Sequence, residues 1–143
     1  MRTYVCACEN PMKTRIVDNK EYVFCEWRRK FVRLTPEEYV RQTFLSRLVA
    51  DYGYPKEKIA VEVFLGGKRA DAVVYAQALQ PVMIIEFKAE TVPLTQKTLD
   101  QAAVYNRQLQ VPYLILHNGP ASLVAHITDQ IQFLKEIPSY SNL

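Results

Sequence analysis

Residues 82–87 read Val-Met-Ile-Ile-Glu-Phe, and Lys88 follows them directly. A nearly unbroken apolar run of this length is typical of a strand that is buried on both faces of a sheet. Glu86 interrupts the run near its end, where a buried carboxylate costs free energy unless it is paired or holds a metal. Glu86 and Lys88 lie two residues apart, so they point to the same face of the strand. The stretch therefore predicts a central strand with a charged site at its carboxyl end.

A helix and two strands are predicted before this strand. Residues 35–38, Thr-Pro-Glu-Glu, offer an N-cap, a proline at the first helical position and a glutamate three residues after the cap. Gly53 and Pro55 then end a predicted helix over 36–52. Alternating apolar residues predict a strand over 59–65, and a Gly-Gly turn leads into a second strand over 70–75.

A second helix and further strands are predicted after it. Thr95 caps a helix over 96–109, which is followed by a buried strand over 112–116 and further strands over 121–127 and, at the edge, 130–137. Near the N-terminus, the aromatic and basic stretch 21–34 predicts a strand or hairpin with residues 27–30 near its turn.

This order of elements predicts an α/β fold, a mixed β-sheet flanked by helices, with a helix-strand-strand-strand-helix-strand core. We interpret residues 1–143 as a single domain. Residues 1–34 form an N-terminal extension, residues 35–128 the core and residues 129–143 a C-terminal edge segment. The chain of 143 residues matches the common size of one domain, so we expect a nuclease-sized domain without an ATP-driven motor.

Composition narrows the class of protein. No apolar run approaches the roughly 20 residues of a membrane-spanning helix, so we expect no membrane association. The net charge of +3 permits a nucleic-acid partner without requiring one. The three cysteines are Cys6, Cys8 and Cys25, an odd count without a secretory signal, which favours a reduced, cytoplasmic location. Cys6 and Cys8 lack a second ligand pair nearby, so the spacing does not favour structural zinc.

Asp71 is the second element of the predicted site. If strand 70–75 pairs antiparallel with strand 82–87, Asp71 lies beside Glu86 on one face. Two carboxylates with a backbone carbonyl form a hard oxygen site for Mg²⁺, which activates water and stabilises charge on a phosphoryl oxygen. Lys88 beside them can orient the water or offset charge, so the group points to phosphodiester hydrolysis. The alternative is a simple same-face ion pair between Glu86 and Lys88.

The helix over 96–109 adds polar groups. Gln101 and Tyr105 lie four residues apart and share one helical face, from which they can hydrogen-bond a site on the sheet or a nucleic-acid backbone. The alternative is a solvated glutamine and a half-buried tyrosine. The opposite face is mostly small or apolar and is predicted to pack on the sheet; it comprises Leu99, Ala102, Ala103, Asn106 and Leu109.

In this order, Asp71, Glu86-x-Lys88 and Gln101-x-x-x-Tyr105 resemble the PD-(D/E)xK nuclease superfamily. The N-terminal domain of type I restriction enzyme R subunits is the more similar pattern. Further matching segments are 35–42 (Thr-Pro-Glu-Glu-Tyr-Val-Arg-Gln), 53–55 (Gly-Tyr-Pro), 68–71 (Lys-Arg-Ala-Asp), 86–89 (Glu-Phe-Lys-Ala) and 100–101 (Asp-Gln). The resemblance covers about residues 31–119. The sequence departs from the superfamily at Ala70, which stands where proline usually precedes the aspartate.

The resemblance implies a restriction-endonuclease-like fold and roles for individual residues. Asp71, Glu86 and the Phe87 backbone carbonyl would hold Mg²⁺, or Mn²⁺ in its place, and Lys88 and Gln101 would complete the catalytic set. Tyr105 and Glu38 would support it, although Glu38 also fits a capping role after Thr35. The substrate would be DNA, and the partners a motor or specificity protein or a second copy in a homodimer.

Two basic clusters are candidate phosphate-binding groups. Lys68 and Arg69 directly precede Asp71, and residues 28–30 (Arg28, Arg29 and Lys30) lie between Trp27 and Phe31, whose rings can stack on bases. The alternative for residues 28–30 is a solvated turn. The alternative for the whole chain is a module that binds nucleic acid or protein on the same fold without cutting.

Overall fold

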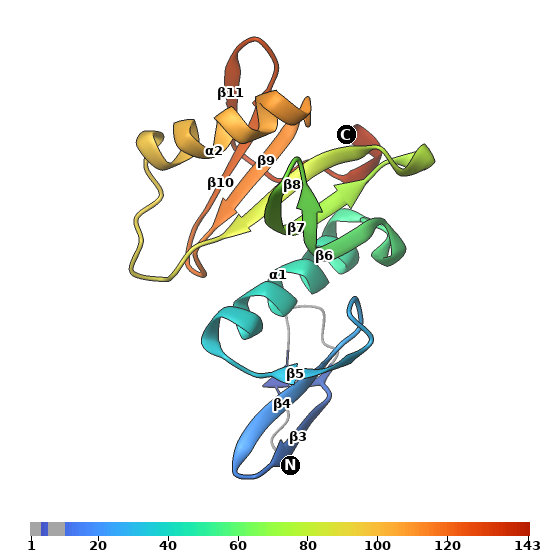
Figure 1. The fold of residues 1–143 in the computed structure, drawn as a ribbon. Coiled ribbons are helices and arrows are strands. Elements are labelled where there is room, and N and C mark those ends of the chain that lie inside the picture. The colour runs from blue at the N-terminus through green and yellow to red at the C-terminus, as the bar shows by residue number, and fades with distance from the viewer. Residues whose placement is uncertain (1–3, 6–10) are drawn as a thin grey trace.

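The computed structural model of the chain describes residues 4–5 and 11–143. A six-stranded mixed sheet forms its centre, in the order β11-β10-β9-β8-β7-β6 (Figure 1). The strands are β6 (Ile59–Leu65), β7 (Lys68–Tyr75), β8 (Pro81–Phe87), β9 (Tyr113–His117), β10 (Ser122–Ile127) and β11 (Ile131–Leu134). The predicted strands are confirmed, with the edge strand shorter than expected.

The predicted central strand is confirmed as β8. It pairs antiparallel with β7 and parallel with β9, and its Met83, Ile84 and Ile85 are fully buried. A parallel pair needs a crossover connection, which α2 (Gln96–Leu109) supplies between β8 and β9. The carboxyl end of β8 therefore lies beside the start of the crossover.

The two α-helices of the described residues cover opposite faces of this sheet. On one face, α1 (Pro36–Tyr52) packs Phe44, Leu45 and Leu48 against residues such as Ile85 and Ile115. On the other, α2 packs Leu99 and Ala103 against neighbouring strand positions, including Leu114 and Leu116. Neither helix in this described part of the chain is long and apolar enough to span a bilayer.

The helix boundaries follow the predicted caps. Thr35 Oγ1 accepts a hydrogen bond from the Glu38 backbone N–H, and Gly53 ends α1 in the left-handed conformation at φ 73°. Thr95 and Thr98 form a reciprocal capping box at the start of α2. Short 3₁₀ helices complete the connections: η1 (Lys56–Lys58), η2 (Gln77–Leu79) and η3 (Tyr140–Asn142).

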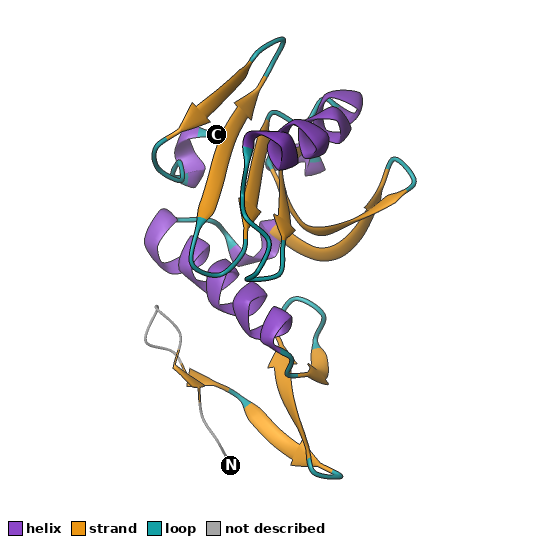
Figure 2. Cartoon of the chain, turned by 90° about the vertical axis from the view of Figure 1, so that its left-hand side faces the viewer, coloured by secondary structure: helices purple, strands orange, loops and turns teal. Residues whose placement is uncertain are grey.

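The N-terminal region forms a separate three-stranded antiparallel sheet, β3-β4-β5, on the side of α1 away from the large sheet (Figures 1 and 2). The strands are β3 (Thr14–Val17), β4 (Lys20–Cys25) and β5 (Lys30–Arg33), and a two-stranded pair, β1 (Tyr4–Val5) and β2 (Pro11–Met12), accompanies them. The predicted hairpin over 21–34 is confirmed as β4–β5, and the preceding strands were not predicted. Cys6 and Cys8 lie outside the described residues, so the prediction about them is not tested. Cys25 is a buried free cysteine.

Candidate functional site

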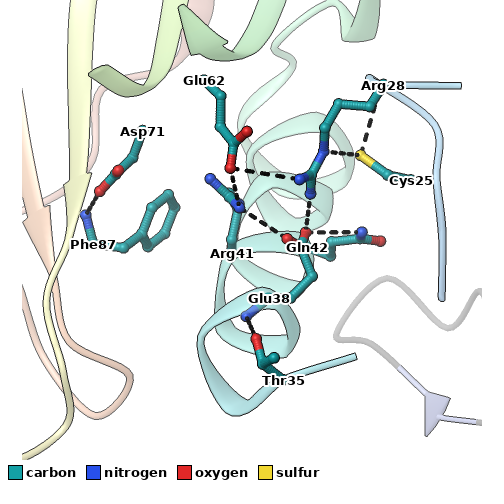
Figure 3. A network of polar contacts seen from close by, with 9 residues as sticks. All are labelled: Cys25, Arg28, Thr35, Glu38, Arg41, Gln42, Glu62, Asp71 and Phe87. Carbon is teal, nitrogen blue, oxygen red and sulfur yellow. Dashed lines mark hydrogen bonds and ion pairs between the residues drawn. The ribbon is translucent and has the colours of Figure 1, made fainter. Parts of the chain in front are cut away.

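The β7–β8 register brings Asp71 and Glu86 together as predicted. Ala72 pairs with Ile85, so Asp71 and Glu86 are the next residues along the two strands. Asp71 Oδ2 accepts a hydrogen bond of 2.8 Å from the Phe87 backbone N–H (Figure 3). The Asp71 carboxylate thereby accepts the hydrogen bond of a backbone N–H at the end of β8. This bond holds the carboxylate against the backbone of the predicted site.

Asp71 occupies this position because the paired side chains of β6 and β7 point to opposite faces of the sheet before and after it. Val61 and Ala72 pair and pack on the α1 side, whereas Val63 and Ala70 pair and pack on the α2 side. Between these pairs, Glu62 has a left-handed backbone with φ 57°, and in the described strands it makes no ladder pair with Asp71. The irregularity interrupts the ladder opposite Asp71, at the position where its carboxylate bonds to β8.

Glu86 is the most perturbed acid of the site. Burial, with the charge and hydrogen bond of the neighbouring Asp71, raises the pKa of Glu86 to about 7, while Lys68 and Lys88 partly oppose the shift. Glu86 Oε1 is buried and has no hydrogen-bond partner among the described residues. A partner-free carboxylate oxygen beside a second carboxylate fits a divalent cation, which would relieve the repulsion and supply the missing partner.

A small pocket of about 200 Å³ opens beside Glu86, between the sheet and α2. It brings together four of the predicted catalytic and supporting residues, Glu86, Lys88, Gln101 and Tyr105, with the predicted phosphate ligand Lys68. Lys68 from the start of β7 also lines it, with its Nζ 4.9 Å from the centroid of the Tyr105 ring. The remaining lining residues come from α2: Thr98, Ala102 and Asn106. Two ammonium groups therefore flank the Glu86 carboxylate.

Tyr105 contributes to the pocket differently from the sequence interpretation. Its hydroxyl donates to the backbone carbonyls of Leu65 and Lys68, the latter at 3.1 Å, and so fastens the β6–β7 turn to α2. The turn fits closely here, because a Cβ at Gly66 would lie 2.7 Å from Leu109 Cδ2. The Tyr105 ring and hydroxyl thus position Lys68 at the pocket, a contact between segments that are 37 residues apart.

Glu38 does not line this pocket. Its carboxylate forms ion pairs with Arg28 at 2.5 Å and Arg41 at 2.8 Å and accepts a hydrogen bond from Gln42 (Figure 3). Arg28 and Arg41 also reach Glu62. Burial raises the pKa of Glu38, but hydrogen bonds from Arg41, Arg28 and Gln42 outweigh it and leave this pKa lowered. The carboxylate therefore serves a charge network between the N-terminal hairpin, α1 and β6.

The two predicted basic clusters have different surroundings. Arg28 differs from the other residues proposed to hold phosphate. Its side chain is only 16% exposed, and its guanidinium contacts Glu38, Glu62 and Cys25 Sγ. Arg29, Lys30 and Arg69 are exposed. Lys68 alone among the proposed phosphate ligands lines the Glu86 pocket.

His117 was given no role from the sequence, and the structure places it next to Phe87. Its ring stacks on Phe44 at 4.3 Å, and Nδ1 lies 2.6 Å from Ser122 Oγ. Burial, with a smaller effect of Arg47, lowers the pKa of His117 to about 4. His117 is therefore a neutral packing residue beneath the end of β8. Its strand-end position was the only signal in the sequence.

Within residues 4–5 and 11–143, no three or more His, Cys, Asp or Glu side chains are grouped to hold a metal. The candidate site thus rests on two carboxylates, and the Phe87 carbonyl ligand stays a prediction.

A comparison with protein families matches residues 36–138 to the type I restriction enzyme R protein N terminus (HSDR_N). The chain belongs to this family. The matched range begins at the first residue of α1 and contains the whole six-stranded sheet, α2 and every pocket residue. A search of curated proteins finds no match to the chain. Membership in the HSDR_N family confirms the resemblance drawn from the sequence motifs, and the three-stranded sheet lies outside the match.

Proposed function

We propose that the chain is a metal-dependent deoxyribonuclease domain that hydrolyses phosphodiester bonds in DNA. The observation that carries the proposal is the buried, partner-free oxygen of Glu86 beside Asp71, in a pocket flanked by Lys68 and Lys88. Membership in the HSDR_N family supports a nuclease-like domain. Most buried polar atoms of folded proteins have a hydrogen-bond partner, so the Glu86 oxygen calls for a ligand that would supply one.

The proposed cation ligands are Asp71, Glu86 and the Phe87 backbone carbonyl. Hard carboxylate and carbonyl oxygens suit Mg²⁺, with Mn²⁺ as an alternative. When bound, such an ion lowers the pKa of water and offsets charge on a phosphoryl oxygen. The hydrogen bond from the Phe87 N–H fixes one Asp71 oxygen, so the carboxylate is held in place before any cation binds.

The pocket residues have separate proposed tasks. Lys88 orients the attacking water and stabilises negative charge that develops on the phosphoryl oxygens. Lys68, positioned by Tyr105, holds a phosphate oxygen of the substrate. Gln101, exposed on the first half of α2, donates or accepts hydrogen bonds to water or to the DNA backbone. Tyr105 acts through Lys68 rather than on the reacting atoms.

Partners are proposed on the basis of the family. An R protein N terminus suggests DNA and other subunits, and we propose a separate motor or specificity protein as the source of movement and targeting. We also propose a cytoplasmic location and, for cuts through both strands, a homodimer.

The test is cleavage by purified protein of supercoiled plasmid and of single-stranded DNA, with Mg²⁺, with Mn²⁺ and with EDTA. We expect cation-dependent cutting that Glu86→Gln and Lys88→Ala each abolish. Glu90→Gln and Lys97→Ala are matched controls, because both are exposed residues outside the pocket. Cutting that persists undiminished in Glu86→Gln or Lys88→Ala would overturn the assignment.

A non-catalytic binding module is the second candidate. The observation that favours it is the lack, within the described residues, of a third side-chain ligand of the kinds that hold metals. Calorimetry separates the two candidates. Heat of Mg²⁺ or Mn²⁺ binding that Asp71→Asn removes supports the nuclease, and an absence of binding in the unaltered protein supports the module.

A further inference from the structure

The outward face of the N-terminal sheet carries a patterned set of cations and rings. Across its three strands, Arg15 pairs with Tyr22 and Tyr22 with Arg33, and on the same face Phe24 pairs with Phe31. Directly paired residues of an antiparallel sheet point to the same side, and side chains alternate along each strand. We define the outer face as Arg15, Val17, Lys20, Tyr22, Phe24, Phe31 and Arg33.

Burial shows that this face meets solvent. The opposite side of the sheet carries Thr14, Val23 and Cys25, which are at most 3% exposed. Arg15, Lys20 and Arg33 are exposed, and the three aromatic rings are half-buried. Figure 2 shows the sheet at one end of the molecule, beyond α1. The opposite side is thus packed around Thr14, Val23 and Cys25, although Ile16 on it is 59% exposed, and the outer face is open.

The arginines lie on the rings. Arg15 Cζ is 3.9 Å from the centroid of the Phe31 ring, and Arg33 Cζ is 5.8 Å from that of Tyr22, both within the range of cation–π attraction. Phe24 supports Phe31 edge-on at 5.4 Å. The rings therefore hold positive charge at set places on the sheet.

These cations also have no carboxylate partner among the residues that the structure describes. Within the described chain, no ion pair includes Arg15, Lys20 or Arg33, and the three strands place no acidic residue on the outer face. Arg28 and Arg41 show the contrast, because carboxylates neutralise both within the protein. Unneutralised charge held on a folded sheet is available to an external anion.

We propose that the outer face binds single-stranded nucleic acid. Its cations match a row of phosphates, and its rings and stacked guanidinium groups offer flat surfaces to unpaired bases. Duplex DNA also offers phosphates to the cations, but its bases are stacked on one another and cannot stack on the protein. The aromatic rings of the outer face therefore favour a single strand. The surface lies outside the family match and does not use the Glu86 pocket, so it is a second site that goes beyond the proposed nuclease function.

The test is fluorescence anisotropy of a labelled 20-nucleotide thymidine strand with the full chain, in EDTA so that no cation-dependent cutting occurs. The variants are Arg15→Ala/Arg33→Ala and Tyr22→Leu/Phe31→Leu. The control is Lys97→Ala/Lys135→Ala, which removes the same charge from exposed positions elsewhere. We expect the arginine variant to weaken binding by roughly tenfold at low salt and to reduce the salt slope by about 1.4, or about 0.7 per lost phosphate contact. The aromatic variant should weaken it roughly fivefold or more.

Equal affinity of the arginine and control variants would overturn the site, and duplex binding as tight as single-strand binding, insensitive to Tyr22→Leu/Phe31→Leu, would overturn the single-strand assignment. NMR of the unaltered protein keeps the test independent of mutant folding. Strand addition should shift amide signals in β3–β5, and shifts confined to the Glu86 pocket would contradict the proposal. Because the test measures binding and no cleavage, the outer-face proposal can fail while the nuclease proposal holds. Equally, the nuclease proposal can fail while the outer-face proposal holds.

Discussion

Replacing Glu86 by glutamine should stabilise the cation-free protein above neutral pH. Burial and the Asp71 charge raise the pKa of Glu86 from 4.5 to about 7. A carboxyl group whose pKa is higher in the folded than in the unfolded state gives its full contribution to stability at pH values below the unfolded-state pKa. That stability is lost as the pH rises from about 4.5 through 7. Glutamine keeps the shape of the side chain and carries no charge, so it avoids the loss.

The magnitude follows from the shift. A difference of about 2.5 pKa units corresponds to about 3 kcal/mol of unfolding free energy, at about 1.4 kcal/mol per unit. At pH 8, Glu86→Gln should therefore be more stable than the unaltered protein by up to about 3 kcal/mol, and at pH 5 by about 1 kcal/mol or less. Because the Asp71 charge contributes to the raised pKa of Glu86, Asp71→Asn should produce part of the same gain.

Urea unfolding in EDTA at pH 8 and pH 5, followed by far-UV circular dichroism, measures both values. Glu90→Gln, an exposed glutamate after β8, is the control and should change neither. A Glu86→Gln protein that is no more stable at pH 8, or that gains equally at both pH values, would refute the reasoning. Added Mg²⁺ should stabilise the unaltered protein and not Glu86→Gln, since only a bound cation shifts the unfolding equilibrium.

Three further predictions concern the surroundings of the site. The pKa of His117 is lowered to about 4 in the folded protein, so the unfolded chain binds a proton at a higher pH than the folded protein does. The free energy of unfolding should therefore fall by up to about 3 kcal/mol as the pH drops from 6.5 to 4. In urea unfolding, His117→Leu in the Glu86→Gln background should lack this fall in stability with pH. Glu38→Gln leaves Arg28 and Arg41 without their full partner and should cost about 3 kcal/mol in the same assay. Tyr105→Phe removes the hydroxyl that fastens the β6–β7 turn and should cost about 1–2 kcal/mol and speed amide exchange in that turn.

Each of these has a control in the chain. Glu37→Gln lies exposed beside Glu38 and should leave stability unchanged, and Tyr52→Phe at the end of α1 should not alter exchange in the β6–β7 turn. A His117→Leu protein that keeps the full acid slope would show that another group causes it. A Glu38→Gln protein as stable as the Glu37→Gln control would show that the arginines rearrange at no cost. Unchanged exchange at the turn in Tyr105→Phe would place the anchor of the hairpin elsewhere.

Much of the fold was predictable because its signals are local. The Thr35 and Thr95 caps, the Gly53 stop and the apolar run of β8 each depend on neighbours within a few residues, and the structure confirms the elements they predict. The proximity of Asp71 and Glu86 was predictable for the same reason, since a short connection between antiparallel strands sets the register. The strand β3 was missed because only Thr14 in it is buried, which leaves no alternation to detect.

The tertiary structure decides whether each charged side chain is buried, paired or exposed. Glu38 and Arg28 looked like a site residue and a phosphate ligand, yet chain segments ten residues apart meet and neutralise each other. Lys68 reaches the pocket because Tyr105, far along the chain, holds the turn that carries it. The sequence by itself determined the two helices, the strands of the large sheet, the β4–β5 hairpin, their order and the pairing of the two acids. Only the folded structure decided which charges are buried, paired or left open, because burial and ion pairing depend on groups that meet through packing rather than through sequence spacing.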